Sequence, residues 1–244
     1  MTSVSSVSSK PVAITLGDPA GIGPEIIGKA FRDAPEAARG AFVAGDVATM
    51  RAALQALSAP GHPAWPVVEI ASLAEALDMP PGCVPVMQVI APPVGVVHGS
   101  ISAEAGRAAG DAVVWAARAA LRGEIAAIVT APLHKEALSA AGFPFPGHTE
   151  LLQAEAAAHL GRDVAEVPVR MMLANDELRT VLVSIHMSLR QAIEAVTFDG
   201  VLETLRITHH ALSRTLGRAP RIGVAGLNPH AGEGGLFGSE EQEI

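Results

Sequence analysis

Four of the nine histidines lie just beyond predicted strands or in loops rich in glycine and proline: His134, His148, His186 and His230. Imidazole is the commonest metal ligand and titrates near neutral pH. Ligands of an open α/β sheet bind at the carboxyl ends of its strands, so these four side chains could share one rim. Neither His186 nor His230 lies in a short metal motif, and two ligands are fewer than metal sites usually have.

The segment around His230 consists of a predicted strand followed by a loop whose side chains are mostly small. The apolar run 222–227 is typical of a buried strand, and the polar segment 228–233 follows it directly. Glycines at 232–238 would let a ligand come close to the backbone. This pattern predicts an imidazole that can reach a metal ion or a substrate.

Two charged residues follow other predicted strands. Asp18 opens the tight loop 18–23, which lacks the glycine spacing of dinucleotide and nucleotide triphosphate loops. A carboxylate there repels phosphate, so we expect Asp18 to bind a hydroxyl, an ammonium group or its own backbone. Lys135 stands at the start of a predicted helix, where the helix dipole disfavours a cation. We expect Lys135 to hold an anion, with a plain exposed helix residue as the alternative.

The segment 147–150 places an imidazole and a hydroxyl at the start of another predicted helix. Thr149 is expected to cap the helix 150–160, and His148 precedes it. The free N–H groups of such a helix end favour a carboxylate or a phosphate. A capping box without any ligand is the alternative.

Strands alternate with helices along the chain, which predicts an α/β fold with a largely parallel sheet. Two short strands around the Asn175-Asp176 turn predict a hairpin. We place a first domain at 10–145 and a second at 146–244. Strands are predicted at 12–17, 41–45, 67–70, 84–90, 126–130, 169–173, 180–185 and 222–227, and helices from Pro24 and at 47–57, 103–122, 134–142, 150–160, 189–196 and 198–216.

The composition narrows the class of protein. With 244 residues, 49% hydrophobic and 17% charged, the chain can bury a large core. A net charge of −8 without a basic stripe argues against nucleic-acid binding. The single cysteine, Cys83, suits a reducing cytoplasm. Residues 1–9 are expected to form a loose tail rather than a signal peptide, and no apolar run approaches the length of about 20 residues that spans a bilayer.

Four segments, in this order, resemble signature blocks of the 4-hydroxythreonine-4-phosphate dehydrogenase (PdxA) family. They are ITLGDPAGIGPE at 14–25, TAPLHK at 130–135, PGHTE at 146–150 and GLNPHAGE at 226–233. The resemblance spans nearly the whole chain. It implies two α/β/α domains of the isocitrate/isopropylmalate dehydrogenase-like type, and a homodimer with its active site near the subunit interface.

The resemblance also implies a reaction. The family oxidises the secondary alcohol of 4-phosphooxy-L-threonine with NAD, with NADP as the alternative cofactor. The β-keto acid then loses carbon dioxide and gives 3-amino-2-oxopropyl phosphate, which is used to build pyridoxal phosphate. A divalent metal polarises the alcohol oxygen in such a reaction.

The family's functional positions carry over residue by residue. Of its three metal-binding histidines, two correspond to His186 and His230; Zn²⁺ is the expected ion, with Mg²⁺, Mn²⁺ and Co²⁺ as alternatives. His148 and Thr149 correspond to substrate-binding positions. Lys135 and Asp18, in two further blocks, are our candidate catalytic residues.

Two departures from the family leave alternatives open. Family members continue well beyond Ile244, and that part is expected to carry the third metal histidine, the phosphate-binding basic residues and part of the NAD site. The chain is therefore expected to be truncated at its C-terminus. Relatives of this family act on threonate or erythronate 4-phosphate, or on aromatic cis-dihydrodiol carboxylates of the terephthalate type. A non-catalytic α/β module that binds an anion is the alternative from another class.

Overall fold

The computed structural model describes residues 10–58 and 65–244, so the loose tail expected at 1–9 lies outside the described residues. The chain forms two compact units, Met1–Val167 and Pro168–Ile244. The domain boundary expected between residues 145 and 146 stays a prediction. It falls just before helix α6 (His148–Leu160), which packs against α4 (Ala103–Leu121) within the first unit.

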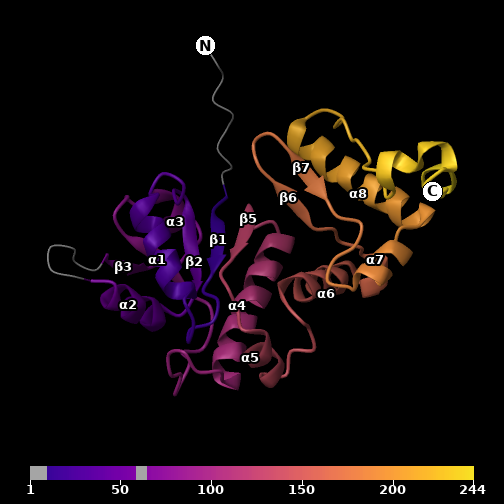
Figure 1. The fold of residues 1–244 in the computed structure, drawn as a ribbon. Helices are drawn as coiled ribbons and strands as arrows, with labels where there is room; N and C mark the ends of the chain where they lie inside the picture. Colours follow the sequence, from indigo (N-terminus) through magenta and orange to yellow (C-terminus); the bar gives the residue numbers. More distant parts are fainter. Residues whose placement is uncertain (1–9, 59–64) are drawn as a thin grey trace, which may run out of the picture. The chain divides into compact units, whose positions relative to one another are not determined.

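The first unit is built on a parallel sheet of five strands in the order β3-β4-β2-β1-β5 (Figure 1). The chain runs from β1 to β2 on one side, and much later places β5 on the other side of β1. The sheet therefore has a topological switch point between β1 and β5, where ligands of open α/β sheets bind. The strands are β1 (Val12–Thr15), β2 (Ala41–Gly45), β3 (Val67–Glu69), β4 (Val84–Gln88) and β5 (Ala127–Thr130).

Helices cover both faces of this sheet, and the alternation of side chains along β2 shows how. Val43 packs into the cluster that contains Ile27 and Met50, whereas Phe42 packs with Ala116 on the opposite face. Both faces of β2 are buried, as in other parallel sheets. Besides α4 and α6, the first unit contains α1 (Gly23–Asp33), α2 (Val47–Ala56), α3 (Glu75–Asp78), α5 (Lys135–Ala140) and the 3-10 helix η1 (Val164–Glu166).

Helix α4 forms where the sequence predicts it, and its composition explains its neighbours. Ser102 is the N-cap, and its side chain accepts a hydrogen bond from the Ala105 N–H at 3.2 Å. Its buried face consists almost entirely of alanine and glycine. A Cβ at Gly106 would overlap the Ala137 carbonyl of α5, so glycine there lets α5 pack directly against α4.

The second unit has a different architecture. The predicted hairpin is confirmed but short: β6 (Met172–Ala174) pairs antiparallel with β7 (Arg179–Val181). Across residues 168–244, only Thr204, Thr208 and Gly232 are buried. The remaining elements are α7 (Leu189–Glu194), α8 (Phe198–Leu216), the 3-10 helix η2 (Pro229–Gly235) and α9 (Glu240–Glu243).

Two local predictions are wrong. The run 222–227 forms no strand, and its side chains are exposed. A strand needs a neighbouring strand for its N–H and C=O groups, and no strand of the described residues pairs with this run. Thr149 is not the cap of α6, since the helix begins one residue earlier with Gly147 as N-cap and no side-chain cap hydrogen bond.

The described residues contain no helix that is both long enough and apolar enough to cross a membrane.

Candidate functional site

The loops that follow β1 and β5 meet at the switch point of the sheet. The Asp18 N–H donates a hydrogen bond of 2.9 Å to the Pro132 carbonyl. Gly17 has a φ of +73°, and a Cβ there would lie 2.5 Å from the Pro132 oxygen. Only glycine allows this close approach. Two signature blocks that are far apart in the sequence are thus joined by their backbones.

Asp18 is directed mainly at its own loop. The residue is 7% exposed, and its Oδ1 accepts a hydrogen bond of 2.8 Å from the Ala20 N–H. Its carbonyl accepts a second one, of 3.0 Å, from the Gly21 N–H. The sequence left three partners open for Asp18: a hydroxyl, an ammonium group or its own backbone. In the structure its carboxylate binds the backbone of its own loop. The carboxylate holds the turn that leads into α1.

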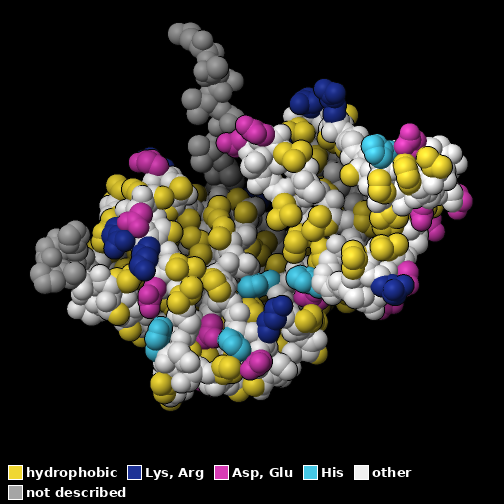
Figure 2. All heavy atoms as spheres, viewed as in Figure 1, with side chains coloured by type: hydrophobic (Ala, Val, Ile, Leu, Met, Phe, Trp, Pro, Cys, Tyr) yellow, Lys and Arg dark blue, Asp and Glu magenta, His cyan; other side chains and the backbone are white. Residues whose placement is uncertain are grey.

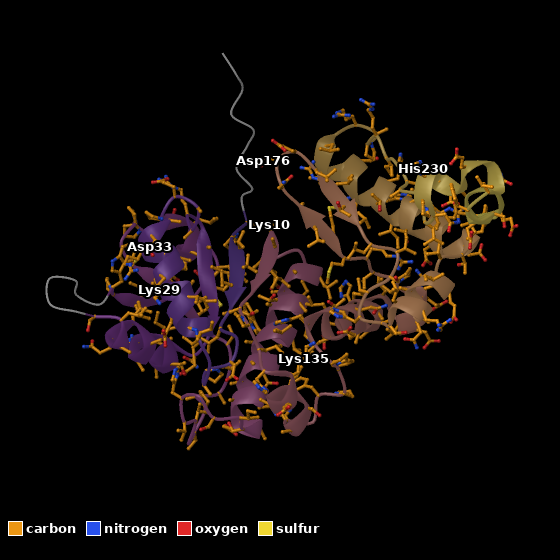
Figure 3. All side chains as sticks on the ribbon, in the orientation of Figure 1. Lys10, Lys29, Asp33, Lys135, Asp176 and His230 are labelled. Atoms are coloured by element: carbon orange, nitrogen blue, oxygen red, sulfur yellow. The ribbon has the colours of Figure 1, made fainter. Side chains whose placement is uncertain are left out.

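Lys135 lies alongside the start of α6. It is exposed, at the first position of α5, and is labelled in Figure 3. A Cβ built on Gly147 would lie 4.0 Å from the Cε atom of Lys135 and 3.7 Å from Oε2 of Glu150. Figure 2 shows a basic side chain and histidine side chains together over α4 and α5. The structure thus brings Lys135 beside the segment that carries His148 and Thr149.

His148 connects α6 to the loop after β5. Its imidazole is half-buried, and this burial lowers its pKa, while a hydrogen bond with the Ala131 backbone acts in the opposite direction. Its Nε2 atom is buried and has no hydrogen-bond partner among the described residues. Ala131 directly precedes Pro132, so His148, Lys135 and Asp18 all adjoin the same short loop.

A hollow of about 460 Å³ opens beside this site, next to the first turn of α1. Pro19 and Gly21 of the Asp18 loop line it, together with Glu25 and His98. The Nε2 atom of His98 lies 3.8 Å from Oε1 of Glu25. The hollow gives the carboxyl edge of the sheet room for a ligand larger than a water molecule.

The sequence analysis did not single out Asp46 and Gln88, which are hydrogen-bonded to each other at the same edge of the sheet. Asp46 follows β2 and is almost fully buried, and its carboxylate accepts hydrogen bonds from the Thr49 N–H at 2.7 Å and the Gln88 amide at 3.0 Å. An aspartate directly after a strand, with a polar residue three positions later, is the signal that could have found it.

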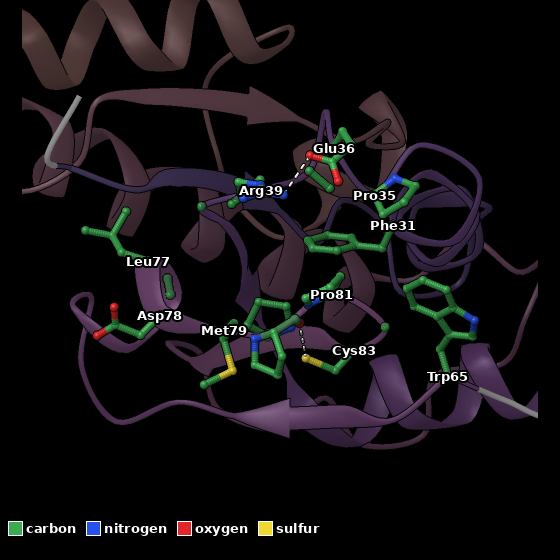
Figure 4. Close-up of a pocket in the computed structure, with 17 residues that line it drawn as sticks. Phe31, Pro35, Glu36, Arg39, Trp65, Leu77, Asp78, Met79, Pro81 and Cys83 are labelled. Atoms are coloured by element: carbon green, nitrogen blue, oxygen red, sulfur yellow. Dashed lines mark hydrogen bonds and ion pairs between the residues drawn. The ribbon is translucent and has the colours of Figure 1, made fainter. Parts of the chain in front are cut away.

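A second pocket, of about 150 Å³, lies at the amino end of the sheet (Figure 4). Phe31, Trp65 and Met79 line it. Cys83 donates a hydrogen bond of 3.3 Å from its Sγ to the Pro80 carbonyl, and burial raises the pKa of its thiol. A thiol that resists ionisation is a poor nucleophile, so these contacts fit a structural role for Cys83.

The two predicted metal ligands both belong to the second unit. His186 and His230 are exposed, and their φ angles are 55° and 53°. Left-handed backbone costs a non-glycine residue about 1–3 kcal/mol and is often retained at functional sites. Their accessible imidazoles suit a divalent metal as donor atoms. The described residues contain no group of three His, Cys, Asp or Glu side chains placed to hold a metal, so the number of ligands is short.

A hydrogen-bonded turn supports His230. The Asn228 N–H donates to Oε1 of Glu241 at 2.7 Å, and the Asn228 side-chain amide donates to Oε2 of Glu240 at 2.6 Å. The Asn228 N–H is also the main reason why the pKa of Glu241 is lowered. The ring of His230 lies 6.0 Å from that of Phe237, between centroids. These contacts fix the backbone on either side of the exposed imidazole.

Known proteins resemble this chain over most of its length. It matches the family described as pyridoxal phosphate biosynthetic protein PdxA over residues 37–244. A 4-hydroxythreonine-4-phosphate dehydrogenase from Beijerinckia indica is 46% identical over 243 residues, or 96% of this chain. A D-threonate 4-phosphate dehydrogenase from Pectobacterium atrosepticum is 41% identical, over 97% of this chain and 69% of its own length.

A solved structure is similar to this chain in both sequence and fold. The crystal structure of a 4-hydroxythreonine-4-phosphate dehydrogenase from Klebsiella pneumoniae is 38% identical and superposes with a TM-score of 0.83. The match covers 98% of this chain and 69% of that one. The chain spans 65% of the length of the Beijerinckia relative.

Proposed function

The chain belongs to the family of pyridoxal phosphate biosynthetic proteins PdxA, and from this premise we propose that the protein containing it is an oxidative decarboxylase. It would oxidise the secondary alcohol of 4-phosphooxy-L-threonine with NAD and release carbon dioxide, giving 3-amino-2-oxopropyl phosphate. The supporting observation is that Asp18, Lys135 and His148, from three separate signature blocks, adjoin one loop at the carboxyl edge of the sheet.

We assign a separate role to each candidate residue at this edge of the sheet. Lys135 supplies an exposed positive charge for the carboxylate or the phosphate of the substrate. His148 and Thr149 bind the substrate at the start of α6. Asp18 shapes the loop against which Lys135 and His148 are placed, so it acts on the reaction through position. NAD, or NADP as the alternative, accepts the hydride when bound.

We further propose that His186 and His230 hold a divalent metal, with Zn²⁺ the first candidate and Mg²⁺, Mn²⁺ or Co²⁺ the others. When bound, such an ion polarises an alcohol oxygen and makes its proton easier to remove. The accessible imidazoles and the left-handed backbone at both residues support this assignment.

Titration with Zn²⁺ tests the metal proposal without any assay of activity. We expect His186→Ala and His230→Ala each to weaken Zn²⁺ binding at least about tenfold. His159→Ala, which removes an exposed imidazole on α6, is the matched control. Unchanged affinity in both site variants would reject these two ligands.

The family resemblance also leads us to propose a larger assembly. The subunit would have two domains of the isocitrate/isopropylmalate dehydrogenase-like type and would form a cytoplasmic homodimer with its active site near the interface. Sedimentation of the protein at several concentrations tests the dimer, which should persist at low concentration.

The deciding experiment for the reaction measures NADH formation. The protein that contains this chain is supplied with Zn²⁺, NAD and 4-phosphooxy-L-threonine, and carbon dioxide release is followed in parallel. Lys135→Met should reduce kcat/KM strongly, because it keeps much of the side-chain length but removes the charge. If no hydroxy acid is turned over with metal supplied, the proposal is wrong.

D-threonate 4-phosphate is the second candidate substrate, and the 41% identity to the Pectobacterium enzyme favours it. The two phosphorylated acids are compared by kcat/KM in the same assay. Erythronate 4-phosphate and an aromatic cis-dihydrodiol, which the signature blocks leave open, complete the panel.

The alternative to an enzyme is a non-catalytic α/β module that binds an anion. The uncapped start of α6 beside Lys135 favours it, since free N–H groups and a cation both attract anions. Calorimetric titration separates the two functions: binding of a phosphorylated acid without NAD affinity or turnover supports the module.

A further inference from the structure

Helix α4 carries two glycines against which the segments leading to the candidate site pack. Helices α5 and α6 both contact α4 (Figure 1). A Cβ at Gly106 would overlap the Ala137 carbonyl of α5, and a Cβ at Gly110, about one turn later, would overlap the ring of Phe143. The ring of Phe143 therefore occupies a notch that exists because residue 110 has no side chain.

Arg107 covers the same ring from α4. Its guanidinium carbon lies 5.2 Å from the ring centroid of Phe143, and its Nη2 atom donates a hydrogen bond to the Ala141 carbonyl. A guanidinium over an aromatic face is attracted to it. One arginine side chain therefore holds both the C-cap of α5 and Phe143, two residues later.

The backbone at the end of α5 directs Phe143 for a local reason. Gly142 has a φ of +85°, and its N–H donates a hydrogen bond of 2.9 Å to the Ser139 carbonyl. The Phe143 N–H donates one of 3.2 Å to the Leu138 carbonyl. These two bonds form a Schellman motif, which ends the helix. The motif and the notch together fix where the chain leaves α5.

The segment that connects Phe143 to α6 is short and stiff. Pro144 and Pro146 lie between Phe143 and Gly147, the N-cap of α6. Proline fixes its own φ and restricts the residue before it. A displacement of the Phe143 ring is therefore passed on to the start of α6, where His148 lies.

The same face of α4 also sets the position of Lys135. This lysine is the first residue of α5, whose backbone lies against Gly106. Its Cε atom lies 4.0 Å from a Cβ built on Gly147. The distance between the basic side chain and the start of α6 thus depends on where α5 and Phe143 pack on α4.

Two further contacts hold the body of α6. Leu151 is fully buried, and Glu155 accepts hydrogen bonds of 2.8 and 3.2 Å from Arg118 of α4. We expect them to keep α6 packed on α4 when Phe143 is replaced, so that such a variant shifts the start of the helix without releasing it.

We propose that Phe143 is a positioning residue for the substrate site: its ring, held in the notch at Gly110 and covered by Arg107, sets the distance between Lys135 and the start of α6. A phosphorylated hydroxy acid would bind across that distance. This inference rests on the proposed function, because it concerns how the same site is held in place.

Nuclear magnetic resonance of the 244-residue chain tests the distance directly. A nuclear Overhauser effect between the ε protons of Lys135 and the α protons of Gly147 should be present, and Phe143→Leu should weaken or abolish it. Gly110→Ala, which displaces the ring without removing it, should do the same. Phe31→Leu, the same change at the amino end of the sheet, is the matched control and should leave the effect intact.

Absence of this Overhauser effect in the unchanged chain would overturn the proposal, and so would an unaltered effect in both site variants. If Gly110→Ala does not fold, Phe143→Leu alone decides. Where both fold, the double variant should lose less in its urea midpoint than the two single losses added together, because leucine leaves room for the new Cβ. Additive losses would show that the ring does not occupy the notch.

Kinetics of the protein that contains this chain separate positioning from loss of stability. With Zn²⁺ supplied, Phe143→Leu should raise the KM for 4-phosphooxy-L-threonine or D-threonate 4-phosphate about tenfold and leave the KM for NAD unchanged. A lower kcat with both KM values unchanged is what instability alone produces, and it would overturn the positioning role. If the unchanged protein turns over neither acid, the proposed function fails, while the Overhauser effect and the double variant still decide whether Phe143 sets the distance.

Discussion

The first and second units hold their candidate site residues in different ways. In the first unit, Asp18, Lys135 and His148 rest on loops and helix ends supported by a parallel sheet whose central strand β2 is buried on both faces. In the second unit, His186 and His230 are exposed on left-handed turns, and the backbone around them is held by local hydrogen bonds. The first site therefore depends on tertiary packing, and the second depends on the hydrogen bonds of its turns.

The largest expected difference between the two units appears when one aromatic ring is removed from each. Phe42 is fully buried, so Phe42→Ala should destabilise the first unit by about 3–5 kcal/mol. Phe237 is 47% exposed, and Phe237→Ala should cost about 0.5 kcal/mol or less. Urea unfolding followed by the fluorescence of Trp65 and Trp115 reports on the first unit, and circular dichroism on both. An equal loss of unfolding free energy in Phe42→Ala and Phe237→Ala would show that the two units do not differ in packing.

The next effect concerns the contact between the two signature loops. Gly17→Ala forces a Cβ against the Pro132 oxygen at a φ of +73° and should cost about 3 kcal/mol. Gly161→Ala is the matched control, because its φ is +64° but no described atom lies within 4 Å of the new Cβ. We expect about 1 kcal/mol there. Thermal or urea unfolding of both variants isolates the close approach from backbone strain.

A smaller effect follows from His148. Its pKa is lowered in the folded chain, so between the folded and unfolded pKa values the unfolded chain binds more protons. The contribution is fully present above the unfolded pKa, near 6.5, and is lost as the pH falls toward the folded value. Urea unfolding at several pH values should therefore show a slope that His148→Gln reduces. An identical slope in the variant would show that this imidazole does not titrate as described.

The smallest effect concerns Glu241 in the second unit. The Asn228 N–H lowers its pKa, so the stabilisation is present above the usual value of 4.5 and is lost as the pH falls through the lower folded value. Resonances of His230 should change with it, since Asn228 anchors the same turn. Glu241→Gln should produce the change already at pH 7. Because this carboxylate bonds only within one turn of the second unit, we expect a local change without loss of the fold.

Local patterns were enough to predict most elements of the first unit. The buried strand Ala41–Gly45 and the long helix that starts after Ser102 lie where hydrophobic periodicity and capping place them. The hairpin around Asn175-Asp176 was also predictable, since its turn is encoded by adjacent residues. The four signature blocks identified the family for the same reason: each is a short, contiguous segment.

Other features needed contacts that no local pattern contains. The apolar run 222–227 has the composition of a strand, but a strand forms only where a neighbour accepts its hydrogen bonds. Thr149 has the chemistry of a cap, yet the helix begins at His148 because Gly147 already provides the non-helical entry.

Neighbouring residues alone set the order of strands and helices in the first unit and the kinds of side chain available for chemistry. The fold alone decided that Gly17 meets Pro132 and that Ala131 meets the ring of His148. Those contacts depend on the parallel pairing of β1 with β5, which brings residues distant along the chain to one edge. Packing of the sheet, and no local preference, therefore sets which residues of the signature blocks meet.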